Sequence, residues 1–167
     1  MGQHVESSHG DAFRLRIAET RDAEAIVSVI NAAFHKAEGF LLDRNRIDLQ
    51  TVQELLQKGT FLVAEDSFLC GCVYLEPRGG DRSYLGLLSV DPQLQKSGLG
   101  SRLMTAAETY CARAGSRFMD LQIVSVRKEL PDFYHRRGYV ETGTAPFPAG
   151  LNPKLPCHFI LMSKPLT

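Results

Sequence analysis

The feature that most constrains this chain is the segment 84–114, in which an apolar stretch, a glycine-bearing turn and a long amphipathic stretch follow one another. Residues 84–90 are apolar and stop just before Pro92, which predicts a strand, because proline cannot continue a β-ladder. Residues 98–114 then predict a helix that ends at Gly115, a typical left-handed stop residue. The apolar side chains that share one face of this helix are Leu99, Leu103, Ala106, Ala107, Tyr110, Cys111 and Ala114.

The turn between this strand and this helix has the composition of an anion-binding site. The first N–H groups of a helix have no internal acceptor, and the helix dipole adds partial positive charge there. Gly98 and Gly100 lack a Cβ, so a phosphate could approach the backbone, while Lys96 adds a positive charge. The spacing alone fits equally well with glycines that merely pack closely on the strand. The turn is not a Walker loop, because no Gly-Lys-Ser/Thr follows at the right distance. It is not G-x-G-x-x-G either, because Leu103 stands where the third glycine belongs.

The pattern Gln95-x-x-Gly98-x-Gly100 after an apolar strand resembles the acyl-CoA pyrophosphate motif of the GNAT superfamily of N-acetyltransferases. The resemblance extends over residues 13–164. It implies the GNAT fold and acetyl-CoA as co-substrate, with the backbone near Leu88 and Val90 pairing with the pantetheine arm. The turn residues that it assigns to the pyrophosphate are Gln95, Lys96, Ser97, Gly98, Leu99, Gly100 and Ser101.

A second segment, residues 133–139, resembles the family's signature of an aromatic residue, tyrosine, basic residues and Gly-aromatic. The resemblance implies that Tyr134 lies near the thioester sulfur and protonates the departing CoA thiolate. A thiol with a pKa of about 8.5 and a phenol with a pKa of about 10 are close enough to share a proton. The alternative is that Tyr134 only packs in the core. His135 points about 100° away round the helix and is expected at the surface, whereas Arg136 and Arg137 either contact CoA phosphates or only solvate the helix.

Two departures from the family pattern leave roles open. Many members carry a glutamate on the central strand that removes the amine proton, but residues 84–88 contain no carboxylate. Glu76, Asp81, Asp120 or a chain of waters could serve instead. Many members also carry an asparagine after the fifth strand that contacts the pantetheine. Arg127 lies in that region and either replaces it, toward CoA or the acceptor, or is an exposed loop arginine.

The rest of the chain predicts one α/β domain over residues 13–167, with residues 1–12 as a disordered leader. The expected sheet is mixed and mostly antiparallel, with one parallel, splayed strand pair and helices on both faces. Thr20 and Asp48 are expected to cap the first two helices. The further strands and helices expected are strand 13–19, helix 20–35, helix 48–58, the hairpin 60–65 and 68–76, strand 117–124 parallel to 84–90, helix 131–137, and strands 139–144 and 157–164.

Two loops are candidates for the acceptor site. Residues 39–46 carry Asp43, Arg44 and Arg46, and in the resembled family the region between the first two helices often shapes this site. A solvated connection explains these residues equally well. Residues 143–156 contain four prolines and two glycines, and loops of this length are often functional.

Charge and cysteine usage exclude several classes of function. The 19 basic and 19 acidic residues balance, so nothing argues for a nucleic-acid or membrane partner. The polar N-terminus has no apolar region typical of a secretory signal. Cys70 and Cys72 are expected on one face of a strand and could form a metal site with Cys157 and His158, but buried cysteines are more often small apolar fillers. Free thiols fit the cytoplasm, and no metal is expected.

The sequence therefore predicts a cytoplasmic, acetyl-CoA-dependent N-acetyltransferase, monomeric or homodimeric, that acts on the amine of a small molecule, a peptide or a protein. The alternative on the same fold is a non-catalytic acyl-CoA-binding or regulatory domain. A nucleotide-binding α/β module is less consistent, because the turn lacks a Walker lysine. A cysteine hydrolase using Cys111 is a remote alternative, because this residue lies on the predicted buried face of the helix.

Overall fold

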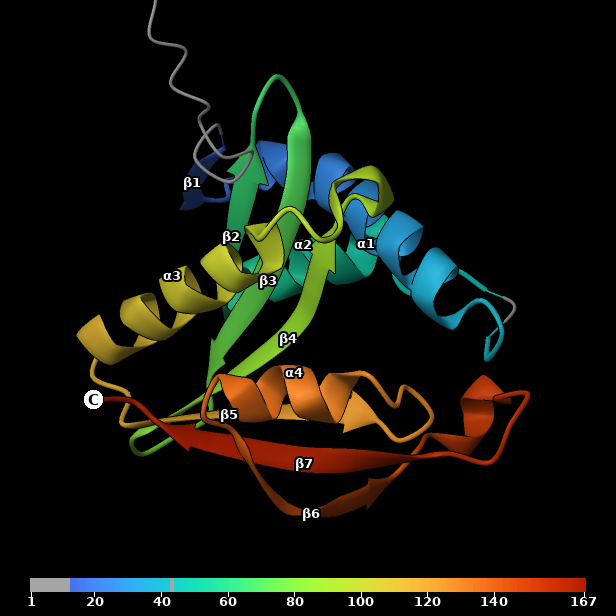
Figure 1. The fold of residues 1–167 in the computed structure, drawn as a ribbon. Coiled ribbons are helices and arrows are strands. Elements are labelled where there is room, and N and C mark those ends of the chain that lie inside the picture. The colour runs from blue at the N-terminus through green and yellow to red at the C-terminus, as the bar shows by residue number, and fades with distance from the viewer. Residues whose placement is uncertain (1–12, 43) are drawn as a thin grey trace, which may run out of the picture.

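The protein, described by a computed structural model over residues 13–42 and 44–167, folds around one seven-stranded sheet with the strand order β1-β2-β3-β4-β5-β7-β6 (Figure 1). The expected leader at residues 1–12, and Asp43, lie outside the described residues. The strands are β1 Arg14–Ile17, β2 Thr60–Glu65, β3 Leu69–Pro77, β4 Arg82–Val90, β5 Phe118–Val124, β6 Val140–Pro146 and β7 His158–Pro165. The helices are α1 Ala23–Glu38, α2 Leu49–Lys58, α3 Leu99–Arg113 and α4 Leu130–Arg136, with short 3-10 turns at η2 Thr20–Asp22, η3 Pro92–Leu94 and η4 Ala149–Leu151.

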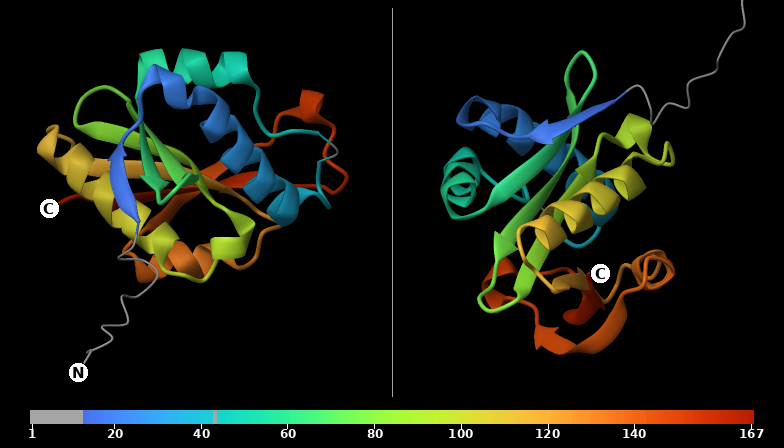
Figure 2. Two further views of the ribbon diagram at one scale, coloured as in Figure 1. Left: turned by 90° about the horizontal axis from the view of Figure 1, so that it is seen from above. Right: turned by 90° about the vertical axis from the view of Figure 1, so that its left-hand side faces the viewer.

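Helices cover both faces of the sheet, as the right-hand view of Figure 2 shows. On one face, α1 and α2 bury residues such as Ile26 and Val52 against Phe61 of β2. On the other face, α3 buries Leu103 in a second core that includes Tyr139, just after α4. Of the described strand pairs, β4–β5 is parallel and the others are antiparallel. The expected mixed α/β architecture is thus confirmed.

The two cysteines of β3 lie on opposite faces of the sheet, so the expectation of a shared face is wrong. Cys70 packs in the core under α3, whereas Cys72 packs in the core under α1. The reason is a register shift between β2 and β3, in which Ala64 pairs with Gly71 but Glu65 pairs with Leu69. This β-bulge leaves Cys70 unpaired and turns its side chain to the other face.

Of the two capping residues expected for the first two helices, Asp48 is confirmed and Thr20 is not. Asp48 caps α2 as expected, because its carboxylate accepts the Thr51 N–H at 2.8 Å. Thr20 does not cap α1 but begins η2, whose cap pairs the carboxylate of Asp22 with the N–H of Glu19. The apolar pattern of residues 48–58 predicts that Leu49 faces inward, but Leu49 is 37% exposed because it lies in the first turn of α2.

The strands β4 and β5 separate after a short parallel contact. Their pairing joins residues 82–84 to residues 118–120 and ends there, while β5 continues with β7 as far as the pair Val124–Phe159. Beside this opening, two residues of β4 lie opposite one of β3, and Leu87 takes a φ of 55°, which is uncommon for a residue with a side chain. Bulges and strained backbone of this kind cluster next to active sites.

None of the helices in the described part of the chain is both long enough and apolar enough to cross a membrane.

Candidate active site

A cavity of about 890 Å³ opens where β4 and β5 separate. Its walls come from the C-terminal half of α1, the bulged part of β4, the start of α3, the end of β5 and α4. The sequence-predicted residues that line it are Leu88, Val90, Gln95, Lys96, Gly98, Gly100, Ser101, Arg127 and Tyr134. Ser97 and Leu99 do not line it, because Leu99 is buried in the core and the Ser97 hydroxyl accepts its N–H at 3.4 Å.

The turn before α3 offers backbone donors to this cavity. The first backbone bond of the helix runs from Arg102 N to Gly98 O at 3.1 Å, and in the described part of the chain the N–H groups of Gly98, Gly100 and Ser101 have no acceptor. Gly98 has a φ of 86°, in the left-handed region that favours glycine. The geometry therefore suits an anion at the helix N-terminus.

The space around the two glycines separates the two interpretations left open by the sequence. A Cβ on Gly98 would meet no atom within 4 Å, and a Cβ on Gly100 would meet only Cγ2 of Val90, at 3.9 Å. Close packing on the strand is therefore not what requires glycine here. The space over the free N–H groups is instead open to the cavity.

The phenol of Tyr134 lies on α4 and lines the same cavity, although the residue is buried. Its ring packs edge-on against Phe133 and Tyr139, with centroids 5.0 and 5.8 Å apart. Burial raises the pKa of the Tyr134 phenol to about 12, against a smaller lowering by Arg127. Tyr134 therefore remains protonated at neutral pH, and the raised pKa makes its phenol a weaker acid than the free phenol assumed for proton sharing with a thiol.

Arg127 is not the exposed loop residue that was one of its two interpretations. Its side chain is 20% exposed, and it forms ion pairs with Glu38 at 3.8 Å and with Glu129 at 2.9 Å. Glu38 ends α1, so this contact ties the segment after β5 to α1. The guanidinium thus lines the cavity between the two carboxylates.

The three carboxylates considered as bases lie elsewhere: Glu76, Asp81 and Asp120 do not line the cavity. Asp120 is held by Arg82, whose Nε donates to it at 2.7 Å, and this hydrogen bond lowers the pKa of Asp120. Glu76 accepts a hydrogen bond from the Tyr74 hydroxyl at 3.2 Å. Among the residues that the structure describes, the carboxylates that do line the cavity are Glu38 and Glu129.

Sequence reasoning missed Glu38 and Tyr84. A carboxylate in the last turn of a helix opposes the helix dipole, and this unfavourable position of Glu38 was the available signal. Tyr84 lines the cavity because its ring folds over Gly86, where a Cβ would lie 2.8 Å from Cε1 of the tyrosine. Arg78 stacks on the other side of this ring, 4.1 Å from its centroid.

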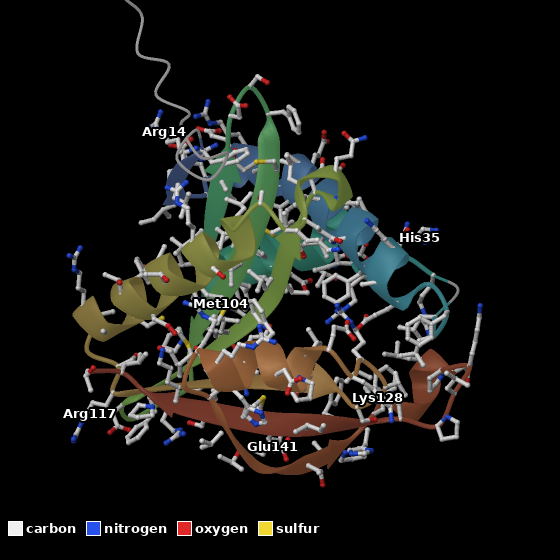
Figure 3. The ribbon with its side chains drawn as sticks, in the orientation of Figure 1. Arg14, His35, Met104, Arg117, Lys128 and Glu141 are labelled. Atoms are coloured by element: carbon white, nitrogen blue, oxygen red, sulfur yellow. The ribbon has the colours of Figure 1, made fainter. Side chains whose placement is uncertain are left out.

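The basic residues of α4 divide between the cavity and the fold. Arg136 lines the cavity, whereas Arg137 donates to the Thr105 hydroxyl of α3 at 3.0 Å and has a structural role. His135 is exposed, as expected, and lies 4.0 Å from Glu141 of β6. His35, near the end of α1, is exposed, and its side chain points away from the sheet in Figure 3.

The two loops proposed for the acceptor site meet at one end of the cavity. Arg44 donates to the Gly150 carbonyl at 3.2 Å, and the Lys154 N–H donates to the Leu41 carbonyl at 2.8 Å. Figures 1 and 2 show the β6–β7 connection beside the C-terminal end of α1. The side chains that these loops contribute to the cavity wall are Leu42, Arg44, Asn45, Arg46, Phe147, Pro148 and Leu151.

A family model described as the acetyltransferase (GNAT) domain matches residues 22–152. The chain belongs to the GNAT family. The match spans both sequence signatures and all the elements that wall the cavity except β7. A search of curated proteins finds no significant match to this GNAT chain.

Solved structures share the GNAT fold with this chain. Ard1 from Thermoplasma volcanium has a TM-score of 0.78 at 17% identity, covering 93% of this chain and 99% of that one. The yncA structure from Salmonella typhimurium, solved with its cofactor acetyl-CoA, has a TM-score of 0.72 at 21% identity and 93% and 95% coverage. The ribosomal-protein-S18-alanine N-acetyltransferase from Escherichia coli has a TM-score of 0.72 at 16% identity and 93% and 94% coverage. At these identities the likeness establishes the fold.

The part of the chain that the structure describes contains no group of three or more His, Cys, Asp or Glu side chains able to hold a metal ion. Cys70, Cys72 and Cys111 are buried free thiols in this GNAT domain. Burial raises the pKa of Cys70 to about 11 and that of Cys72 to about 12, which makes both unreactive at neutral pH.

Proposed function

We propose that the chain is an N-acetyltransferase that transfers an acetyl group from acetyl-CoA to the amine of a small molecule, a peptide or a protein by direct attack. The observation that carries the proposal is that one cavity joins the free N–H groups before α3 to the protonated phenol of Tyr134. The turn before α3 suits a pyrophosphate, and Tyr134 supplies a phenolic proton donor elsewhere in the wall of the same cavity. Residues 13–167 act as a single acetyltransferase domain in this proposal.

The N–H groups of the turn at residues 95–101 bind the pyrophosphate, and Lys96 adds a positive charge at its edge. The backbone near Leu88 and Val90 pairs with the pantetheine arm, since the bulge and the missing β5 partner leave this part of β4 facing the cavity. Acetyl-CoA supplies an already activated thioester, so that positioning contributes much of the rate. Tyr134 donates its phenolic proton to the leaving thiolate.

Arg127 lies between these groups and the loops at residues 39–46 and 143–156. Its ion pairs with Glu38 and Glu129 hold its guanidinium at the cavity wall. We assign it to the cofactor site, where it replaces the asparagine of other family members. We further propose that the protein acts in the cytoplasm, since a reducing compartment suits its free thiols.

The experiment is a transfer assay in which the purified protein, acetyl-CoA and a panel of primary amines are mixed and the release of free CoA thiol is followed. Amine-dependent thiol release supports the proposal. The alternative, a non-catalytic acyl-CoA-binding or regulatory domain, predicts acetyl-CoA binding with no thiol release for small amines, peptides or protein N-termini. That outcome would remove Tyr134 from the proposed catalytic role.

A further inference from the structure

Glu38 is a carboxylate enclosed at the acceptor end of the cavity. It is the last residue of α1, it lines the cavity, and its side chain is 12% exposed. The other carboxylate that lines the cavity in the described part of the chain, Glu129, is 64% exposed. A buried carboxylate without a hydrogen-bond donor at close range is costly, and among the described residues the one ion-pair partner of Glu38 is Arg127, at 3.8 Å. This distance leaves the Glu38 carboxylate able to accept a hydrogen bond from another group.

Charged and titratable side chains face Glu38 from several segments that pack at this end of the cavity. Arg127 and Glu129 face it from the segment after β5, Arg46 from the segment after α1, and the Cys157 thiol from the start of β7. Burial raises the pKa of Glu38, and the two arginines oppose this rise only in part. Arg46 is itself stacked over the Phe34 ring, 5.4 Å from its centroid, and the ion pair of the Glu38 carboxylate in the described residues is with Arg127.

We propose that Glu38 accepts the proton of the acceptor amine, and that the amine enters between the C-terminal end of α1 and the β6–β7 loop. This inference rests on the proposed function. Glu38 stands where the loops joined by Arg44 and Gly150 meet the cavity, and Arg127 links it to the side of Tyr134. The base thus comes from α1 and not from the central strand, which carries no carboxylate between residues 84 and 88.

The proton and electron balance follows from these positions. The acceptor ammonium gives one proton to the Glu38 carboxylate, and the free amine attacks the thioester carbonyl. The C–N bond forms and the C–S bond breaks, while the leaving thiolate takes the phenolic proton of Tyr134. The second proton of the nitrogen then returns to the Tyr134 phenolate, and Glu38 releases its proton to solvent, so that one proton is released per acetyl group.

The nature of the walls defines the class of acceptor. Phe34, Phe147 and Phe159 supply aromatic surface beside Glu38, with Leu42 and Leu151 around them. An acidic group enclosed by aromatic and aliphatic side chains favours a cationic primary amine carried on an apolar or aromatic body. A highly charged polyamine has no such complement, because the remaining charged side chains at this end are mostly arginines.

The test compares Glu38→Gln with Glu129→Gln, which removes the other carboxylate partner of Arg127. Glu38→Gln should lower kcat/KM for the acceptor roughly 10²-fold, remove the acidic limb of its pH profile and leave acetyl-CoA affinity unchanged. Glu38→Asp, which keeps a carboxylate, should retain an acidic limb at reduced rate. Glu129→Gln should retain the acidic limb, displaced to lower pH, because the charge of Glu129 raises the pKa of Glu38.

Two outcomes would overturn the assignment of Glu38. One is an equal loss in Glu38→Gln and Glu129→Gln, which would mean that both act by holding Arg127. The other is an acidic limb that survives in Glu38→Gln. Carboxyl NMR titration gives a readout apart from activity: the resonance absent from Glu38→Gln should titrate above the ordinary glutamate range. If the wild-type protein transfers no acetyl group to any amine, the proposed function itself fails, and the role of Glu38 with it.

Discussion

The rings of Tyr134 and Tyr139 pack edge to face, with centroids 5.8 Å apart, but only Tyr134 lines the cavity. The hydroxyl of Tyr139 is buried and has no hydrogen-bond partner in the described residues. Because Tyr134 is the proposed general acid, Tyr134→Phe should lower kcat by roughly 10²-fold. Acetyl-CoA affinity and thermal stability should change little. Steady-state kinetics and calorimetric titration measure the two effects separately.

Tyr139→Phe is the matched control for this change. It removes a phenolic hydroxyl from the same ring pair without removing a hydrogen bond, so both kcat and acetyl-CoA affinity should stay at the wild-type level. Equal rates for the two variants would reduce Tyr134 to a packing role. A loss of acetyl-CoA affinity in Tyr134→Phe would instead place the phenol in cofactor binding.

Gly100→Val fills the space over the free N–H groups of α3. The protein itself has room for the new side chain, because the nearest atom to a Cβ is Cγ2 of Val90 at 3.9 Å. Folding should be unaffected, since glycine is already a poor helix former. CoA affinity should fall roughly 10- to 100-fold, where each factor of ten is about 1.4 kcal/mol. Calorimetric titration with CoA measures it.

Gly143→Val makes the same change in β6, outside the cavity, where a Cβ would also meet a single atom, Cδ1 of Leu161, at 3.9 Å. This control should bind CoA like the wild-type protein. Unchanged CoA affinity in Gly100→Val would mean that the turn does not hold the pyrophosphate.

Arg127→Ala should shift the acidic limb of the pH–rate profile. Glu38 works as a base only when deprotonated, so activity falls as pH decreases through its pKa. The charge of Arg127 lowers that pKa, and removing it raises the pKa further. The acidic limb should therefore move to higher pH, and CoA or acceptor affinity should fall. Measurement of kcat/KM between pH 5 and 9 tests the shift; a profile identical to that of the wild type would contradict both roles of Arg127.

The lowered pKa of Asp22 predicts how the free energy of unfolding changes as the pH falls. Arg16 donates to both of its carboxylate oxygens at 2.8 Å, and this pairing lowers the pKa of Asp22. A lowered folded-state pKa gives stability that is present above the ordinary carboxyl range and lost as pH falls through the folded value. Asp22→Asn should reduce the free energy of unfolding by about 1–2 kcal/mol at pH 7, and by less near pH 2. Urea unfolding at both pH values measures this, and an equal loss at both would contradict it.

The fold could be predicted because its periodicities are plain in the sequence. Proline and glycine mark the ends of the β4 and α3 segments, and the alternation of residues 60–65 and 68–76 gives the hairpin. What could not be predicted depends on contacts between distant segments. The β2–β3 bulge that separates Cys70 from Cys72 is a change of register, and register is set by packing rather than by local composition.

The site was predictable as far as local motifs define it. The turn at residues 95–101 and Tyr134 lie in contiguous signatures, and both reach the cavity. Glu38 and Tyr84 belong to no such signature and join the cavity only because β4 and β5 separate. The left-handed backbone of Leu87 likewise leaves no trace in its residue type.

Calorimetric titration of the purified protein with acetyl-CoA, CoA and ATP tests the central claim most directly. The account predicts micromolar binding of acetyl-CoA and of CoA and no binding of ATP, because the cavity continues from the phosphate-binding turn along β4 toward Tyr134. Absence of binding for both CoA species would contradict the account. Equal binding of ATP would identify the turn as a general phosphate site instead.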